Sequence, residues 1–400
     1  MDDVIKRTML TRTQESRENR PSSRNSHQTE STMIQGDKGK TSENAIPTMT
    51  QESNEKSSAV QLKEINPIEI NGQIDIYSVA FLVNEKHVVS GGYEGKIRRW
   101  RVEDGEEVGM PMDAGNHILS IAVSRDGKWI VSGTKNGLVT VWNAESGKKV
   151  TEFTGHMDYV RAVDVSSDGT RIVTGSDDKT ACVWSLSTGK QLLGPLKHDR
   201  YWVVDAKFSP DGCLVATATL RSVRVYENDR LLIDVNFTYV KSVWDKPLAW
   251  ASDAKQLFAL SYGSIHCLDG STGITLSKWP VHSSENVNVQ CIALANNNTF
   301  IAASAGSSVS LWSTTTHNRI GSVIEFTHDI SSMAISPNYD LVIGGKKTIS
   351  LFSLCNILPS SYFDVVSAHA SILMRQDGFL IINRSCRTSG TMAQVRSFTP

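Results

Sequence analysis

One unit of about 42 residues is repeated seven times along this chain, and this repetition limits how the chain can fold more than any other feature. Each unit contains a short run that ends in an aromatic or apolar residue, and successive end residues are 42, 42, 42, 42, 44 and 40 positions apart. They are Trp100, Trp142, Trp184, Tyr226, Leu268, Trp312 and Phe352. A unit of this size cannot bury its own apolar face, so neighbouring units must pack on one another.

The runs within each unit have the composition of β-strands. Segments such as "WIVSG", "LVTVW" and "RIVTG" are rich in β-branched and aromatic residues. Turn sequences such as "SRDG", "SSDG" and "SPDG" separate them, and no long amphipathic helical pattern interrupts the series. We therefore predict an all-β fold from Ile76 onward.

The two ends of the chain lack this pattern. Residues 1–62 contain no Phe, Trp or Tyr and are rich in polar residues, so they cannot bury enough apolar surface to offset the entropy cost of ordering. We predict a disordered N-terminal arm over 1–62. The tail, residues 357–400, contains two apolar patches, "SILM" and "FLII", which fit either a hairpin packed on the last unit or a mobile segment.

Charge and cysteine content exclude several classes of function. The chain has 41 basic and 42 acidic residues, which gives no general electrostatic reason to expect nucleic-acid binding. Its six cysteines are scattered, without a CxxC pair or a His at zinc-ligand spacing, so we expect no metal site and no cofactor. No run of 18 apolar residues and no signal-like N-terminus are present, so we expect no membrane insertion and a cytoplasmic or nuclear location.

The repeats resemble those of the WD-repeat β-propeller family, whose units are four-stranded blades with a Gly-His pair and a Trp-Asp pair. The third unit is nearest to the family pattern, with Gly155 and His156, then "SSDG", then "TGSDDKTACVW". At the seven repeat positions no Trp is followed by Asp, which departs from the family pattern. The resemblance implies a seven-bladed β-propeller of four-stranded antiparallel blades over residues 63–356.

A closed ring needs its two ends joined. The segment 63–72, "KEINPIEING", aligns with the outer strand that precedes blade 3, but it has no earlier blade to join. We therefore predict that it is the outer strand that completes blade 7, where it would cover an exposed edge.

The resemblance also implies a hydrogen-bonded chain in blade 3. In the family, a His before the first strand, a Ser or Thr in the second strand, an Asp in the next turn and the Trp of the third strand are linked, and the matching residues are His156, Thr174, Asp178 and Trp184. We interpret this set as a structural brace, because a catalytic set would need a cleft and an activated nucleophile. Other blades have Glu94, Asn136 or Leu220 in place of the Asp, so blade 3 should be the most rigid.

A ring of blades without an enzyme module indicates a binding function. By resemblance, protein or peptide partners would contact one face of the ring, and we expect neither catalysis nor a small-molecule substrate. The residues at the positions that contact partners in the family are Tyr93, Leu119, Lys135, Tyr159, Arg161, Asp177, Trp202 and Thr219. The leading hypothesis is a scaffold or adaptor.

The alternative is a substrate receptor or regulatory subunit of a larger complex, such as a ubiquitin ligase or a signalling assembly. In the family, propellers that dock on adaptors often have an Arg two residues after the Trp. The matching residues in the first three blades are Val102, Ala144 and Leu186, which favours the scaffold.

Overall fold

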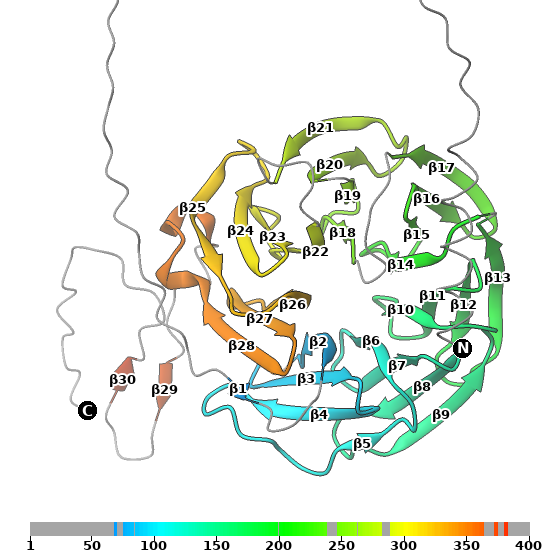
Figure 1. The fold of residues 1–400 in the computed structure, drawn as a ribbon, viewed down its shortest axis with the longest axis horizontal. Helices are drawn as coiled ribbons and strands as arrows, with labels where there is room; N and C mark the ends of the chain where they lie inside the picture. Colours follow the sequence, from blue (N-terminus) through cyan, green and yellow to red (C-terminus); the bar gives the residue numbers. More distant parts are fainter. Residues whose placement is uncertain are drawn as a thin grey trace, which may run out of the picture. The chain divides into compact units, whose positions relative to one another are not determined.

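The computed structural model describes residues 68–69, 75–83, 85–198, 200–237, 246–261, 263–281, 289–363, 372–374 and 380–382. The arm predicted over 1–62 lies outside these residues. In the described part of the chain, seven four-stranded antiparallel sheets are arranged as blades around a common centre (Figure 1). The predicted seven-bladed β-propeller is therefore confirmed.

Each blade has four strand positions. The innermost strands are β2 (Ile76–Phe81), β6 (Ile118–Val123), β10 (Val160–Val165), β14 (Val203–Phe208), β18 (Leu248–Trp250), β22 (Val289–Leu294) and β26 (Ile330–Ile335). The second strands are β3 (His87–Gly92), β7 (Trp129–Thr134), β11 (Arg171–Ser176), β15 (Leu214–Thr219), β19 (Gln256–Ser261), β23 (Phe300–Ala305) and β27 (Asp340–Gly345).

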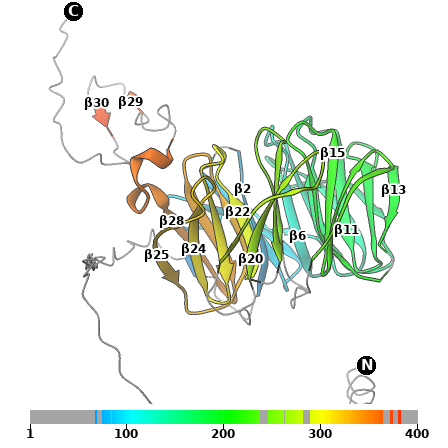
Figure 2. The same ribbon diagram turned by 90° about the horizontal axis from the view of Figure 1, so that it is seen from above.

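The two outer positions complete the blades. The third strands are β4 (Lys96–Arg101), β8 (Leu138–Asn143), β12 (Thr180–Ser185), β16 (Ser222–Glu227), β20 (Ser264–Asp269), β24 (Ser308–Ser313) and β28 (Thr348–Ser353). The outer strands are β5 (Met112–Asp113), β9 (Lys149–Thr154), β13 (Gln191–Lys197), β17 (Arg230–Asn236), β21 (Thr275–Pro280), β25 (Arg319–Glu325) and β1 (Ile68–Glu69). Figure 2 gives the edge-on view, in which the strands cross the thickness of the ring.

The repeat seen in the sequence is the repeat of the third strand. Each of the seven aromatic or apolar residues that mark the repeat is the fifth residue of its third strand. Six of them are buried and Trp312 is half-buried. The repeat length therefore equals the number of residues that the chain uses for one blade.

The core lies between blades. Val131 and Val141 of blade 2 pack in one cluster with Ile172 and Trp184 of blade 3. Because each blade has a neighbour on both sides, its middle strands are buried on both faces, as β11 shows with five consecutive buried residues. The outer strand β9 instead has no buried residue, because it borders the solvent.

A second set of contacts joins the innermost strands of successive blades. In each contact a backbone N–H donates to a side-chain oxygen of the preceding blade: Ile121 to Ser78 at 2.9 Å, Val163 to Ser120 at 3.2 Å, Phe208 to Asp164 at 2.9 Å, and Leu248 to Asp205 at 3.0 Å. The same contact joins blade 7 to blade 1, where the Val79 N–H donates to Ser332 Oγ at 3.2 Å. The closing junction thus uses the same kind of hydrogen bond as four of the junctions inside the ring, two of which also have a serine as the acceptor.

The ring is also closed by a strand from upstream of blade 1. β1 pairs antiparallel with β28, with Ile68 opposite Ile349 and Glu69 opposite Thr348. This pairing makes β1 the fourth strand of the last blade. Only two residues of the segment 63–72 form this strand, and the other residues of that segment lie outside the described part of the chain.

The chain continues past the propeller boundary expected at residue 356. Two 3₁₀ turns, η1 (Leu354–Asn356) and η2 (Ser360–Tyr362), follow β28, and Leu358 between them is buried. Tyr362 and Phe363 pack against the core cluster of blades 6 and 7. The packed region therefore extends to Phe363. Farther along, β29 (Ile372–Met374) and β30 (Leu380–Ile382) pair with each other.

Candidate functional site

The loops that lead into the innermost strands and the turns between the second and third strands lie on one face of the ring. Hydrogen bonds join the two within a blade: the N–H groups of Tyr93, Lys135 and Asp177 donate to the carbonyls of Asp75, His117 and Tyr159 at 2.9 to 3.0 Å. We call this the loop face. All the predicted partner-contact residues lie on or just beneath it.

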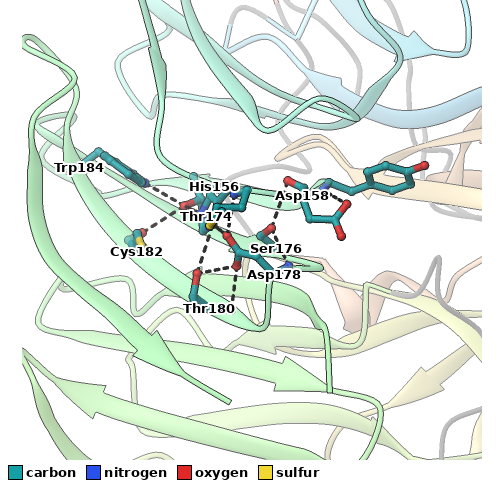
Figure 3. A network of polar contacts seen from close by, with 10 residues as sticks. His156, Asp158, Thr174, Ser176, Asp178, Thr180, Cys182 and Trp184 are labelled. Atoms are coloured by element: carbon teal, nitrogen blue, oxygen red, sulfur yellow. Dashed lines mark hydrogen bonds and ion pairs between the residues drawn. The ribbon is translucent and has the colours of Figure 1, made fainter. Parts of the chain in front are cut away.

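In blade 3 the four residues of the predicted brace form an unbroken hydrogen-bonded chain (Figure 3). Trp184 Nε1 donates to Thr174 Oγ1 at 2.8 Å, and Thr174 Oγ1 lies 2.6 Å from His156 Nε2. His156 Nδ1 lies 2.8 Å from Asp178 Oδ2. The chain runs from the centre of the blade core to the turn that follows β11.

The partners fix the direction in which protons are donated along this chain. The Asp178 carboxylate can only accept, so His156 donates from Nδ1, which leaves Nε2 of the neutral ring as an acceptor. Thr174 then donates its hydroxyl proton to Nε2 and uses a lone pair for the indole N–H of Trp184. Each polar atom is satisfied by its neighbour, which is the arrangement that stabilises a buried network.

The turn at the end of the chain holds Asp178 in its charged form. Burial opposes ionisation, but hydrogen bonds from His156 and Thr180 outweigh it and lower the pKa of Asp178 to about 2. Thr180 Oγ1 donates to Asp178 Oδ1 at 2.6 Å, and the Met157 N–H donates to Oδ2 at 3.0 Å. The carboxylate therefore ties the loop before β10 to the turn after β11.

This set of Thr, His and Asp has the residue types of a hydrolytic triad but not its accessibility. The Thr174 side chain is 0 % exposed and its oxygen already accepts from Trp184. A nucleophile must reach a substrate, so the geometry supports a brace at this position and gives Thr174 no route to attack.

Other blades contain parts of the network. The Trp-to-hydroxyl bond recurs in blade 1, where Trp100 donates to Ser90 at 2.8 Å, and in blade 2, where Trp142 donates to Ser132 at 2.9 Å. The His-to-hydroxyl contact recurs in blade 4 between His198 and Thr217 at 3.1 Å. Among the described residues, the complete chain of four occurs in blade 3.

Aromatic and cationic side chains bridge adjacent blades on the loop face. The Tyr93 ring of blade 1 lies 4.2 Å from the His117 ring of blade 2. Lys135 Nζ of blade 2 lies 5.1 Å from the centre of the Tyr159 ring of blade 3. Cations placed over aromatic faces at such distances are attracted by the ring quadrupole.

The bridge between blades 3 and 4 is centred on Arg161. Its guanidinium carbon lies 5.5 Å from the Tyr159 ring and 5.6 Å from the Trp202 ring. Arg161 Nε and Nη2 donate to the two carboxylate oxygens of Asp177 at 2.5 and 2.6 Å, and both residues are buried. Burial raises the pKa of Asp177, although its pairing with Arg161 acts in the opposite direction.

Half of the predicted contact residues are buried in the structure. Leu119, Arg161, Asp177 and Thr219 are buried, so their side chains are not free to anchor a partner on the surface. Leu119 and Arg161 are the second residues of innermost strands, and the Trp202 ring of blade 4 lies against Arg161. Thr219 turns inward and shares a 2.9 Å hydrogen bond with Ser222, and Asp177 is occupied by Arg161.

The remaining four are accessible and form an arc across blades 1 to 4. Tyr93 is 53 % exposed and Trp202 is 38 % exposed, while Lys135 and Tyr159 are half-buried. We call these four residues the aromatic arc. Its members are linked across the blades: Tyr93 contacts His117 of blade 2, Lys135 contacts Tyr159 of blade 3, and Arg161 lies between Tyr159 and Trp202 of blade 4.

Sequence reasoning missed further residues beside the arc. Met157 is 97 % exposed in the loop before β10. Arg221 lies with its guanidinium carbon 5.4 Å from the Tyr201 ring, at the edge of blade 4. The sequence "DRYWVV" places Tyr201 directly before Trp202, and this pair of adjacent aromatic residues was the available signal.

The described residues offer neither a metal site nor a membrane-spanning helix. No group of three or more His, Cys, Asp or Glu side chains in this part of the chain is placed to hold a metal ion. Among the same residues, no helix is long and apolar enough to span a membrane.

Comparisons with known proteins were made for both sequence and structure. The family model "WD domain, G-beta repeat" matches residues 68–101, 113–143 and 147–185, which run from β1 to the end of β12. A search of curated protein sequences found no match.

Among solved structures, the chain is similar to the WD40 repeats of RRP9, with a TM-score of 0.63 and 19 % sequence identity over 72 % of this chain and 97 % of that one. It is also similar to U3-55K, with a TM-score of 0.63 and 19 % identity over 73 % of this chain and 98 % of that one. At this identity the likeness establishes the fold.

Proposed function

We propose that this chain, a WD-repeat β-propeller, is a non-enzymatic scaffold that binds a protein or peptide partner on its loop face. The proposal depends on the aromatic arc of Tyr93, Lys135, Tyr159 and Trp202, which crosses four blades. Tyr and Trp are enriched among the residues that dominate binding energy at protein interfaces.

The side chains beneath the arc hold its aromatic rings in place before a partner binds. Arg161 is held between Tyr159 and Trp202 by its buried pair with Asp177, so the two rings keep their positions without a partner. A surface that is ordered in advance loses less conformational entropy when a partner binds. In blade 3 the brace fixes the loop that carries Tyr159, because Asp178 accepts from the Met157 N–H.

The charges around the arc favour a protein over a nucleic acid. The Arg161 cation is neutralised by Asp177, the Lys135 ammonium lies over the Tyr159 ring, and the exposed Asp158 lies directly beside Tyr159. Nucleic-acid binding draws most of its affinity from unpaired cations that contact phosphates. We therefore propose a protein or peptide partner in the cytoplasm or nucleus.

The test compares two double variants of the full chain as bait for native partners. Tyr93→Ala with Trp202→Ala removes the two exposed ends of the arc. The matched control, Leu231→Ala with Ile274→Ala, removes two exposed apolar side chains from an outer strand and a turn away from the loop face. Quantitative mass spectrometry would measure the recovery of each partner.

We expect at least one partner to be lost about tenfold or more with the arc variant and retained with the control, since each good aromatic anchor is worth about 2 kcal/mol. An identical partner set for the parent and the arc variant, with both folded by circular dichroism, would remove the loop face from the proposal.

A further inference from the structure

A cavity of about 730 Å³ lies at the centre of the opposite face of the ring. Every blade contributes to it with the last residue of its innermost strand, and we call these residues the mouth ring. They are Phe81, Val123, Val165, Phe208, Trp250, Leu294 and Ile335. All seven are apolar or aromatic, and six of them are only half-buried.

Two residues that line the cavity have buried polar atoms without partners among the described residues. The indole N–H of Trp250 is buried and makes no hydrogen bond, and one carboxylate oxygen of Glu85 is buried without a partner. Buried polar atoms are nearly always satisfied in native proteins. The apolar mouth ring, partly exposed around an open cavity, has the character of a surface that a polypeptide covers.

The C-terminal chain leaves the propeller at the rim of this cavity. The Tyr362 carbonyl accepts hydrogen bonds from Asn297 Nδ2 at 2.8 Å and Thr299 Oγ1 at 2.9 Å. These two residues belong to the turn between β22 and β23, and its members Asn296 and Asn298 line the cavity. The last packed residues of the chain therefore contact a turn that also borders the cavity.

The tail carries a segment that needs such a surface. The strands β29 and β30 pair with each other and consist of Ile, Leu and Met residues alone. An isolated two-stranded hairpin is marginally stable in water unless it packs against an apolar surface. Nine Cα–Cα steps separate Phe363 from Ile372, so the hairpin stays within about 30 Å of the rim.

We propose that the β29–β30 hairpin docks on the mouth ring and closes the cavity from the face opposite to the aromatic arc. Because the hairpin and the mouth ring belong to one chain, docking is intramolecular, and a short linker gives an effective concentration in about the millimolar range. The inference is independent of the proposed function because the two surfaces share no residue. It makes the tail an internal ligand that an external partner would have to displace.

The first test places a photoreactive benzoylphenylalanine at Ile381 in the full chain and maps the crosslinks by mass spectrometry. We expect crosslinks within one chain to the mouth ring and its turns. Crosslinks between two copies, visible as a covalent dimer, would assign the cavity to a second copy and overturn the proposal. Crosslinks that avoid the mouth ring would also overturn it.

The second test measures tryptic cleavage at Arg384, just after the hairpin. Leu380→Asp with Ile382→Asp should release the hairpin and speed cleavage about tenfold or more. The control, Thr388→Asp with Ser389→Asp, adds the same charge beyond the hairpin and away from the cleaved bond, and it should leave the rate unchanged. Equal rates for the parent and the Leu380, Ile382 variant would show that the hairpin is not docked.

A variant of the cavity separates docking from hairpin stability. Val165→Asp places a charge in the mouth ring while the tail keeps its sequence. It should speed cleavage at Arg384 as much as the tail variant does, provided that circular dichroism shows a folded ring. A parental rate in a folded Val165→Asp protein would mean that the tail is protected elsewhere.

Discussion

Replacing Thr174 by valine tests whether the four residues of the blade 3 network act as a unit. Valine has nearly the same shape as threonine, so the change leaves no cavity but removes the hydroxyl that joins Trp184 to His156. Two buried polar atoms, the indole N–H and the imidazole Nε2, then lose their partner. Each such atom costs about 1 to 3 kcal/mol, so the free energy of unfolding should fall by about 3 kcal/mol.

Two controls separate the network from simpler effects. Thr174→Ser keeps the hydroxyl and loses one methyl group, which should cost about 1 kcal/mol. Ser132→Ala in blade 2 removes the acceptor of a single indole N–H, from Trp142, and should cost about 1 to 2 kcal/mol. The expected order is Thr174→Val as the largest loss and the two controls well below it.

The assay is equilibrium unfolding in urea, followed by far-ultraviolet circular dichroism, with the free energy taken from the linear extrapolation. A Thr174→Val protein no less stable than Ser132→Ala would refute the reasoning, because it would show that His156 contributes nothing through the shared hydroxyl. Non-additivity between Thr174→Val and Asp178→Asn would measure the coupling along the chain directly.

Three further predictions concern neighbouring residues. The folded-state pKa of Asp178 is lowered from 3.8 to about 2, so its carboxylate contributes about 2 kcal/mol to the free energy of unfolding above pH 4. This contribution is lost as the pH falls through about 2. The free energies of urea unfolding of Asp178→Asn and the parent should therefore differ at pH 7 and converge near pH 2. Arg161→Ala leaves Asp177 buried without its partner and should lower the free energy of unfolding by about 3 to 5 kcal/mol. Arg161→Met with Asp177→Leu replaces both charges and should restore most of this stability. Equal urea midpoints for the single and double variants would argue against the buried pair. Gly155→Ala places a methyl group 1.7 Å from Trp184 Cη2 and should lower the free energy of unfolding by about 1 to 3 kcal/mol. The loss, measured by thermal or urea unfolding, should be smaller in a Trp184→Phe background. An equal loss in both backgrounds would mean that the new methyl group does not contact the indole.

The contact residues on the loop face show where sequence reasoning fails. The aligned positions in each repeat identified Arg161 and Trp202 equally, yet one is buried and the other is exposed. Repeat alignment gives the position of a residue within its own blade. Burial on this face depends on the side chains of the next blade, because Arg161 is covered by Trp202 and paired with Asp177.

The junctions between blades were also hidden in the sequence. Ser78, Ser120 and Asp205 read as ordinary strand residues, and only the ring places each beside a backbone N–H about one repeat later. The link from Ser332 to Val79 spans 253 residues and exists only because the ring closes. A pattern within one repeat cannot indicate a hydrogen-bond partner that is brought close only when the first and last blades meet.

The sequence by itself determined the number of blades and the strand that marks each repeat, because strand period and turn chemistry are local properties of the chain. The four members of the blade 3 network came from its resemblance to the WD-repeat family. The tertiary structure decided which side chains reach the surface, which charges are paired and where the tail leaves the ring. These depend on contacts between blades that are distant along the chain, and packing between neighbouring sheets sets them.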